Sequence, residues 1–342
     1  MVATRYDLDR DELSAVLGGH PSYRVDQVWD GMYRGLAEPA ELTNLPKALR
    51  ETLRACPQLA PALVLSREST TVDGATCKWL WSLADGSRIE TVLMHYPGRS
   101  TVCVSTQAGC AMACGFCATG QAGFSRNLTS GEMVEQVVRA GRAALAAGRR
   151  VSRVVFMGMG EPLANYDNTL GAVRKMHADL GISARHLTLS TVGVVPGIRK
   201  LADEPLPVNL AVSLHAANDR LRDELVPINR RYPLDVLLES CARYLAAKGR
   251  RLSLEWACID GVNDRPSDAL ELAVIARRLG AHVNVIPLNP TPGYATRGTS
   301  AAGVRAFRDL LRSSGVNVTV RQNRGTAIDA ACGQLAAAPA KL

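Results

Sequence analysis

The sequence predicts an α/β protein whose main part is a partial (β/α)6 barrel. From residue 100 onward, strand-like runs alternate with amphipathic helical segments, which indicates a parallel sheet covered by helices. The alternation gives six units, and six fit an incomplete barrel better than a closed eight-fold one. Cysteine-rich and small polar turns follow the strands, at the edge where such folds bind ligands. An open doubly wound sheet is the alternative.

The first 60 residues differ from the rest. They are polar segments with spaced apolar positions, punctuated by prolines, and they predict short helices. These helices are Asp9–Leu17, Arg24–Arg34 and Lys47–Arg54. The next segment predicts a β-hairpin, because two strand-like runs flank Asp85-Gly86, a favoured hairpin turn. Its strands are Ala75–Leu83 and Ser87–His95.

The barrel elements follow in order. The expected strands are Thr101–Ser105, Arg153–Met157, His186–Thr191, Val208–Leu214, Leu252–Cys258 and Val283–Pro287. The expected helices are Gly131–Ala147, Asn168–Leu180, Pro196–Ala202, Arg220–Val226, Leu234–Lys248, Ser267–Leu279 and Ala301–Ser313. Gly315–Val320 is a candidate extra strand, and the segment 321–325 after it has the composition of a mobile tail.

The amino-acid composition limits the functions that this chain can have. The chain has 342 residues, enough to bury a full core, and no run of 18 or more apolar residues, so no transmembrane helix is expected. Free thiols without a secretory signal predict a cytoplasmic location. The formal charge is +8, and arginine supplies 34 of the 40 basic residues. Arginine suits a polyanionic substrate such as nucleic acid, although a GC-rich coding bias would raise arginine and alanine together.

The most informative motif is Cys110-Ala-Met-Ala-Cys114-Gly-Phe-Cys117, a C-x3-C-x2-C loop just after the first barrel strand. Cysteine thiolates hold iron–sulfur clusters, and a [4Fe–4S] cube has four iron corners. Three thiolates leave one iron free for the amino and carboxylate groups of S-adenosylmethionine, whose reductive cleavage gives a 5′-deoxyadenosyl radical. The spacing is typical of radical S-adenosylmethionine enzymes. The alternatives are three buried structural thiols, or a zinc site with Cys103 as fourth ligand.

Small polar groups end other predicted strands at the same edge. The turn Met157-Gly-Met-Gly-Glu161-Pro162 allows close backbone approach, and Glu161 can accept a hydrogen bond from an ammonium group. Later strand ends carry Ser190, Ser213, His215 and Asn289. Each is a weak signal, since turns favour such residues anyway. Together they suit a polar ligand such as S-adenosylmethionine.

Three further residues stand out. Cys103 lies on the first barrel strand and Cys332 lies near the C-terminus. A buried or incidental thiol is the alternative for each. Glu90 lies on the second hairpin strand, where a solvated carboxylate is the alternative.

On these residues the sequence resembles the RlmN/Cfr family, radical enzymes that methylate adenosine in RNA. The resemblance runs over nearly the whole chain. It includes Cys103-Val-Ser-Thr-Gln-Ala-Gly-Cys110, Gly158-Met-Gly-Glu-Pro162, Ser213-Leu-His-Ala216, Asn289-Pro290 and Asp329-Ala-Ala-Cys-Gly-Gln-Leu335. The amino-terminal Tyr23-Arg24 with Gln27-Val28-Trp29 is similar to the RlmN branch. That branch methylates C2 of adenosine in 23S rRNA and in certain tRNAs, whereas the Cfr branch methylates C8.

The resemblance implies a domain organisation. Residues 1–60 would form a helical accessory domain, 61–99 the β-hairpin extension, 100–320 the partial radical enzyme barrel, and 321–342 a mobile tail that carries a methyl-carrier cysteine. It also implies a flavodoxin- or ferredoxin-type reductant, and we expect a monomer that binds no membrane.

The resemblance also implies a role for each candidate residue. The cluster ligands would be Cys110, Cys114 and Cys117. The S-adenosylmethionine site would be lined by Gly160, Glu161, Ser190, Ser213, Leu214, His215 and Asn289. Cys332 would carry the methyl group, Cys103 would resolve the adduct through a disulfide, and Glu90 would accept the ring proton. Two S-adenosylmethionine molecules would be used per turnover.

Three competing functions stay open on the sequence. The chain could be a Cfr-like C8 methyltransferase, a radical enzyme acting on a metabolite, or a non-catalytic zinc-dependent RNA-binding protein.

Overall fold

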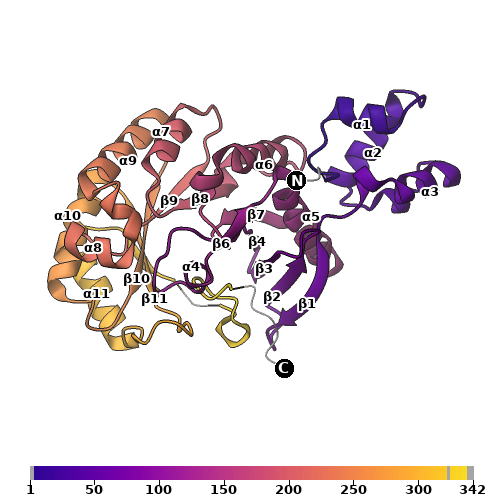
Figure 1. The fold of residues 1–342 in the computed structure, drawn as a ribbon. Coiled ribbons are helices and arrows are strands. Elements are labelled where there is room, and N and C mark those ends of the chain that lie inside the picture. The colour runs from indigo at the N-terminus through magenta and orange to yellow at the C-terminus, as the bar shows by residue number, and fades with distance from the viewer. Residues whose placement is uncertain (1–3, 322–323, 337–342) are drawn as a thin grey trace.

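The computed structural model describes residues 4–321 and 324–336, and its centre is one long twisted sheet (Figure 1). Within these residues ten strands pair in the order β1-β2-β3-β4-β7-β8-β9-β10-β11-β12. The strands are β1 (Val64–Thr70), β2 (Thr76–Ser82), β3 (Arg88–Tyr96), β4 (Arg99–Cys103), β7 (Val151–Phe156), β8 (Leu187–Thr191), β9 (Asn209–Ser213), β10 (Leu252–Cys258), β11 (His282–Pro287) and β12 (Val318–Val320).

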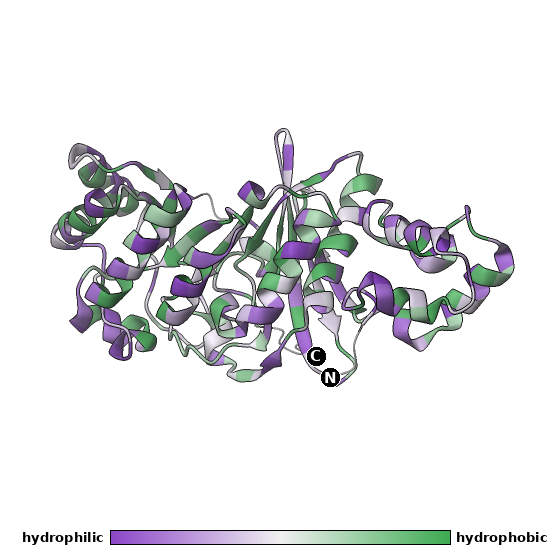
Figure 2. Cartoon of the chain, turned by 90° about the horizontal axis from the view of Figure 1, so that it is seen from above, coloured by the Kyte–Doolittle hydropathy of each residue, from purple (hydrophilic) through white to green (hydrophobic). Residues whose placement is uncertain are grey.

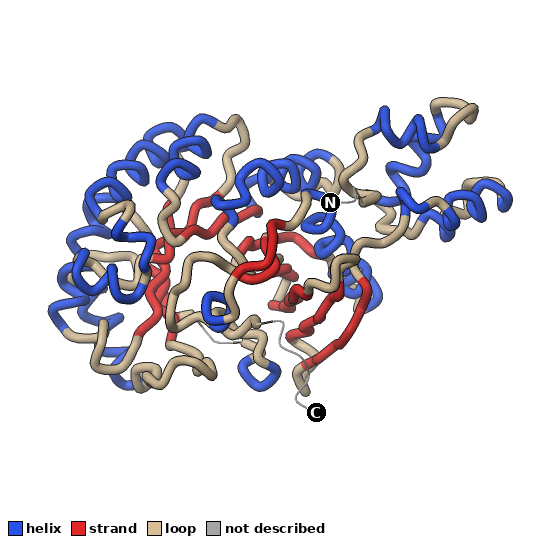
Figure 3. The backbone as a smooth tube through the Cα atoms, viewed as in Figure 1, coloured by secondary structure: helices blue, strands red, loops and turns tan. Residues whose placement is uncertain are grey.

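The part from β4 to β12 is the partial barrel that the sequence predicts. All neighbours from β4 through β12 pair in parallel. Helices cover the outer side of this curved sheet (Figure 3). They are α5 (Ser130–Ala146), α6 (Tyr166–Ala178), α7 (Val195–Asp203), α8 (Asp219–Leu225), α9 (Leu234–Lys248), α10 (Pro266–Leu279) and α11 (Ala301–Ser313). The six expected strands and the expected helices are all present, with ends shifted by a few residues at most.

Local chemistry explains where several of these helices begin and end. Thr129 and Glu132 form a reciprocal capping box at the start of α5, which satisfies two backbone N–H groups that the helix leaves unpaired. Helices α9 and α10 both end at a glycine in the left-handed conformation, Gly249 and Gly280. A glycine there costs no Cβ strain. These signals fix the lengths of the helices that cover the sheet.

The parallel strands are apolar on the face that packs against the helices, whereas the opposite face also carries polar residues. Figure 2 shows hydrophobic residues gathered on the central strands, with hydrophilic residues distributed over the surrounding helices. Leu187, Leu189, Leu210, Leu254 and Val283 have no exposed surface. One large core therefore runs along the whole barrel. In the described residues, no helix is long and apolar enough to cross a lipid bilayer.

Strands β1, β2 and β3 add an antiparallel extension to the barrel edge, where β3 pairs with β4. The sequence predicted β2 and β3 but missed β1. Six of the seven β1 residues are exposed, so the strand lacks the alternation that marks a half-buried strand. The short hairpin of β5 (Gln107–Gly109) and β6 (Phe124–Asn127), and helix α4 (Ala118–Gln121), were also missed. They form around the cysteine loop.

Three helices lie beyond the end of the sheet near the N-terminus: α1 (Arg10–Val16), α2 (Tyr23–Tyr33) and α3 (Lys47–Ala55) (Figure 1). Polar contacts tie the preceding segment to the barrel. Asp7 accepts hydrogen bonds from Thr129 Oγ1 and from the Gly131 amide. Lys175 Nζ on α6 donates to the carbonyl oxygens of residues 6, 7 and 8. The helices are thereby fixed against α5 and α6.

Candidate active site

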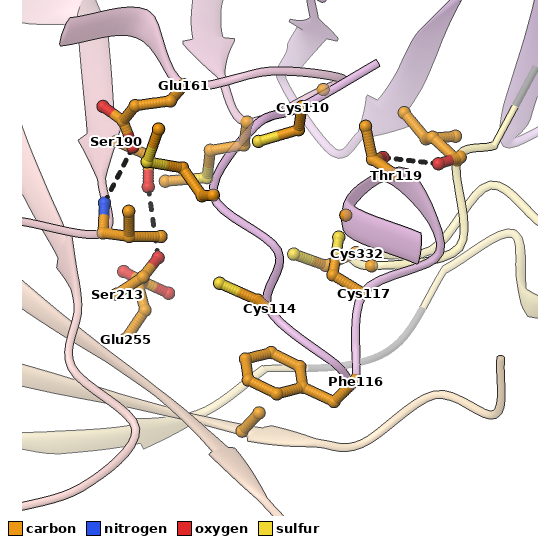
Figure 4. A pocket seen from close by; sticks show the side chains of 18 of the residues that line it. Cys110, Cys114, Phe116, Cys117, Thr119, Glu161, Ser190, Ser213, Glu255 and Cys332 are labelled. Atoms are coloured by element: carbon orange, nitrogen blue, oxygen red, sulfur yellow. Dashed lines mark hydrogen bonds between the residues drawn. The ribbon is translucent and has the colours of Figure 1, made fainter. Parts of the chain in front are cut away.

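One cavity opens at the carboxyl ends of the parallel strands, where the sequence predicted a ligand site (Figure 4). The predicted residues that line it are Cys110, Cys114, Cys117, Gly160, Glu161, Ser190, Ser213, His215, Asn289 and Cys332. Leu214 lies beside Ser213 but is fully buried and does not line the cavity. Cys103 and Glu90 lie outside this cavity, near the C-terminal segment.

The cysteine loop is held in a defined shape by its backbone. The Cys110 amide donates to the Gly123 carbonyl at 2.7 Å, and the Cys117 amide donates to the Cys114 carbonyl at 3.1 Å. Ala113 adopts a left-handed conformation with φ of 53°, which a non-glycine residue adopts only under local constraint. Burial raises the pKa of the Cys114 thiol and raises that of Cys110 to about 11. A bound metal would reverse this shift, because a coordinating thiol is deprotonated.

The three thiols of the cysteine loop lie on one side of the cavity (Figure 4). Cysteine thiolates hold iron–sulfur clusters, whereas a structural zinc ion takes four protein ligands. Within residues 4–321 and 324–336, no group of three His, Cys, Asp or Glu side chains is already placed to hold one metal ion. Met112 and Phe116 add an apolar wall to the cavity, which suits a buried cluster.

Glu161 faces the cysteine loop from the end of β7. Its side chain is buried; Oε1 accepts from the Leu163 amide at 3.0 Å and Oε2 accepts from the Val192 amide at 2.9 Å. Burial raises the pKa of this carboxyl to about 7, against the effect of the two amides. Gly160 has φ of 98°, and a Cβ there would lie 2.5 Å from Gln107 Cβ. The glycine is therefore required for close packing against β5.

Side chains on β8 and β9 form the opposite wall. Ser190 Oγ and Ser213 Oγ lie 3.5 Å apart. His215 has φ of 59°, accepts from the Ala257 amide through Nδ1 at 3.0 Å, and packs edge-on against Phe116. Burial lowers the pKa of His215 to about 3, so the imidazole is neutral at physiological pH. The wall therefore offers two hydroxyl groups and an uncharged ring.

The sequence reasoning missed Glu255, which also lines the cavity. It lies opposite Ser213 in the β9–β10 pairing and is buried. Ser253 Oγ and Asn284 Nδ2 donate to its two carboxylate oxygens at 2.8 and 2.9 Å. Burial raises the pKa of Glu255. The detectable signal was a carboxylate inside an otherwise apolar central strand, where an unpaired charge is costly.

The described part of the C-terminal segment closes one side of the cavity. The Ala118 amide donates to the Gly333 carbonyl at 2.8 Å, and Thr119 Oγ1 donates to the Leu335 carbonyl. Asn289 Nδ2 donates to the Cys332 carbonyl at 2.9 Å. The last part of the predicted tail, residues 337–342, lies outside the described residues, as do 322–323.

Cys332 lines two cavities. One contains the cysteine loop, and the second, smaller one is lined by Cys103 and Arg321 together with Met94, Tyr96, Met157 and Arg324. Cys332 is an exposed residue, but the protein atoms around its thiol raise the pKa of that thiol, while the Arg321 charge lowers it. Cys103 is buried, which raises its pKa to about 12. The structure thus brings Cys332 between the loop and Cys103.

Glu90 lies beside the same segment. It is 5% exposed, so the alternative of a solvated strand carboxylate is wrong. Glu90 Oε1 pairs with Lys78 Nζ at 2.9 Å, and Oε2 accepts from the Ala336 amide at 3.1 Å. Lys78 also donates to the Asp329 carbonyl at 3.0 Å. Both side chains therefore help to hold in place the segment that carries Cys332.

Comparison with known proteins gives the class of this protein. Residues 104–273 match the Radical SAM superfamily, so the chain is a radical S-adenosylmethionine protein. It is 51% identical to a probable dual-specificity RNA methyltransferase RlmN from Frankia alni, over 98% of this chain and 83% of that protein. It is 50% identical to the dual-specificity RNA methyltransferase RlmN 1 from Myxococcus xanthus, over 98% and 94% of the two chains.

A solved structure gives the same result. The crystal structure of a radical SAM methyltransferase from Sphaerobacter thermophilus superimposes with a TM-score of 0.94 at 50% identity, covering 98% of this chain and 100% of that one. The chain belongs to the RlmN family. The predicted fold class and the predicted family are thereby confirmed.

Proposed function

We propose that this protein methylates C2 of adenosine in 23S rRNA and in tRNA, through a methyl group carried on Cys332. The observation that carries the proposal is the position of Cys332, which borders both the cavity of the three-cysteine loop and the smaller cavity that contains Cys103. A carrier thiol must reach a methyl donor on one side and a resolving thiol on the other. The RlmN relatives are named as RNA methyltransferases, which supports RNA as the substrate.

Cys110, Cys114 and Cys117 would hold a [4Fe–4S] cluster, with one iron left for S-adenosylmethionine. When bound, the cluster supplies the electron that cleaves S-adenosylmethionine to a 5′-deoxyadenosyl radical. Glu161 would accept from the ammonium group of the ligand, since its carboxylate already faces the loop. Ser190 and Ser213 would bind hydroxyl groups. The ligand would also contact Gly160, His215 and Asn289, which line the cavity.

Cys332 would act first, as a nucleophile. Its thiolate attacks the methyl carbon of one S-adenosylmethionine, so that the methyl group bonds to Cys332 and S-adenosylhomocysteine leaves. The Arg321 guanidinium, which lines the same two cavities, favours the thiolate form. One hydrogen atom of the S-methyl group is then lost to the deoxyadenosyl radical of a second S-adenosylmethionine. The remaining methylene carbon bonds to C2 of adenine.

Glu90 and Cys103 would complete the turnover. The adduct would return one electron to the oxidised cluster, and Glu90 would take the proton from C2. The Cys103 thiolate would then attack the sulfur of Cys332, so that a disulfide forms as the carbon–sulfur bond breaks and the released methylene carbon takes one proton from solvent. A flavodoxin- or ferredoxin-type protein would supply the two electrons that reopen the disulfide. The target base must leave its stack to reach this site.

We further propose that the four segments 1–60, 61–99, 100–320 and 321–342 act as accessory domain, extension, barrel and methyl-carrier tail. The chain would work as a cytoplasmic monomer. Four arginines of the first segment, on α2 and α3 or directly after α2, would bind RNA phosphates. These are Arg24, Arg34, Arg50 and Arg54.

The test is a nucleoside assay. Anaerobically reconstituted protein is incubated with reductant, methyl-deuterated S-adenosylmethionine, and either a 23S rRNA fragment or tRNA, and the digested nucleosides are analysed by mass spectrometry. We expect 2-methyladenosine that retains two deuterium atoms. Product methylated at C8 would instead favour a Cfr-like activity. Colourless protein with stoichiometric zinc and no iron would overturn the proposal altogether.

A further inference from the structure

Arg222, on helix α8, is a buried cation without an acidic partner. Its side chain has no exposed surface. No ion pair found among the described residues includes Arg222, and its hydrogen bonds all go to neutral oxygens. Burial lowers the pKa of Arg222 to about 10, which still leaves it charged at neutral pH. A buried charge is costly unless a compensating group lies nearby.

The guanidinium joins the ends of two strands that border the cavity. Nη2 donates to the Val192 carbonyl at 2.6 Å, just beyond β8. Nε donates to the Leu214 carbonyl at 3.1 Å, just beyond β9. Val192 and Ser213 both line the cavity. Arg222 therefore sets the spacing of the two strand ends that carry Ser190 and Ser213.

On its other side, the guanidinium contacts the side-chain amide of Asn229, which is itself hydrogen-bonded to two carboxylates. Nη1 donates to Asn229 Oδ1 at 2.7 Å. Asn229 Nδ2 in turn donates to Asp219 Oδ1 at 2.9 Å and to Asp223 Oδ1 at 2.7 Å. These carboxylates are joined to Arg222 by hydrogen bonds only through the amide, although their charges also favour the charged form of Arg222. The network fixes the orientation of the guanidinium but leaves its charge without a directly paired anion.

Helix α8 also packs against the cysteine loop. Leu225 and Val226 share a small apolar cluster with Cys114 and Phe116, separate from the main barrel core. Val192, whose carbonyl accepts from Arg222 Nη2, packs against the same cluster. The guanidinium is therefore tied directly to the apolar cluster that contains Cys114.

We propose that Arg222 is a positioning residue that holds a positive charge behind the cluster site and thereby raises the reduction potential of the cluster. The inference rests on the proposed ligation by Cys110, Cys114 and Cys117. Reduction adds one electron to the cluster. A fixed positive charge in a low-dielectric interior stabilises the reduced state more than the oxidised one. Removing the charge should make the cluster harder to reduce.

The experiment compares three variants of the full-length, reconstituted protein. Arg222→Gln removes the charge, Arg222→Lys keeps the charge but not the planar set of N–H donors, and Arg220→Gln removes an exposed charge from the same helix. Iron and sulfide are counted for each. The midpoint potential of the cluster is then measured by an electron paramagnetic resonance titration with dithionite as the electron source, without RNA.

We expect Arg222→Gln to shift the reduction equilibrium at least tenfold toward the oxidised cluster, about 59 mV for one electron. Arg222→Lys should stay within threefold of the unsubstituted protein, and Arg220→Gln should not differ from it. An unchanged potential in Arg222→Gln with a full complement of iron overturns the inference. If that variant does not retain iron, Arg222→Lys decides: a tenfold shift there, with the charge still present, overturns it. Unsubstituted protein that binds no iron and sulfide would instead contradict the proposed function.

Discussion

The side-chain amide of Asn289 donates a 2.9 Å hydrogen bond to the backbone carbonyl of Cys332. Asn289 follows β11 at the mouth of the barrel, and Cys332 lies on the C-terminal segment. This contact joins a residue of the proposed S-adenosylmethionine site to the proposed methyl carrier. The position of the carrier thiol is thus linked to the wall against which the methyl donor would bind.

Cys332→Ala should abolish methylation of the protein by S-adenosylmethionine, because no other thiol lies in the C-terminal segment. The measurement is peptide mass spectrometry after incubation with labelled S-adenosylmethionine. Cys56→Ala is the matched control, since this partly exposed thiol lies outside both cavities. A methylated peptide recovered from Cys332→Ala would show that another residue carries the methyl group.

Cys103→Ala should permit methyl loading and addition to RNA but not release. The thiol that would attack Cys332 sulfur is then missing, so a covalent protein–RNA adduct should accumulate. Denaturing gel electrophoresis with end-labelled RNA detects it. Cys77→Ala, on strand β2 of the same sheet, should show no adduct. Repeated turnover by the Cys103 variant would remove this residue from the reaction.

Glu90→Gln should slow release of methylated RNA by roughly 10² to 10⁴-fold, the usual contribution of a general base, without affecting methyl loading. Single-turnover kinetics measure the rate. Lys78→Ala is the informative control, because it breaks the same ion pair and leaves the carboxylate in place. If release of methylated RNA slows equally in both variants, Glu90 acts by holding the C-terminal segment in place and not as a base.

Gly120→Ala should reduce the iron content of the purified protein. A Cβ at this position would lie 2.9 Å from the Cys114 carbonyl oxygen, so the cysteine loop would have to shift. Gly115→Ala is the control within the same loop, since its Cβ would meet nothing closer than 3.9 Å. The iron and sulfide contents of the two purified variants are measured and compared. Equal iron in both variants would mean that the loop tolerates the displacement.

Because of Glu41, the free energy of unfolding should depend on pH in the acidic range. Paired hydrogen bonds from Arg142 at 2.7 and 2.9 Å lower the pKa of this carboxyl from 4.5 to about 2. The folded-state pKa is depressed, so the stabilisation is present above about pH 4.5 and is lost as the pH falls toward 2. The pair is half exposed, and its contribution should stay below about 1 kcal/mol.

Urea unfolding at pH 7 and pH 3 tests this expectation. Glu41→Gln should lower the free energy of unfolding at pH 7 and reduce the loss between the two pH values. Glu51→Gln, on the exposed face of α3, should change neither. An identical pH dependence in Glu41→Gln and the unsubstituted protein would contradict the assignment.

Much of the barrel was predictable because its signals are local. The capping residues at Thr129 and Glu132, and the glycines that end α9 and α10, act within one helical turn. Strand β1 was not predictable in this way, because its exposed residues carry no periodic pattern. Its place in the sheet depends on pairing with β2, which is a contact between segments and not a property of either one.

The candidate site shows the same difference between local sequence signals and contacts that join distant segments. The spacing of Cys110, Cys114 and Cys117 is a short-range feature, so the sequence alone specified a loop with three thiols near one another, and with it the class of radical S-adenosylmethionine enzymes. Only the tertiary structure placed Cys332 between that loop and Cys103, buried Glu90 against Lys78, and left Arg222 charged behind Cys114. Such contacts join residues far apart in the chain, and their geometry comes from the packing of strands and helices, which no local pattern encodes.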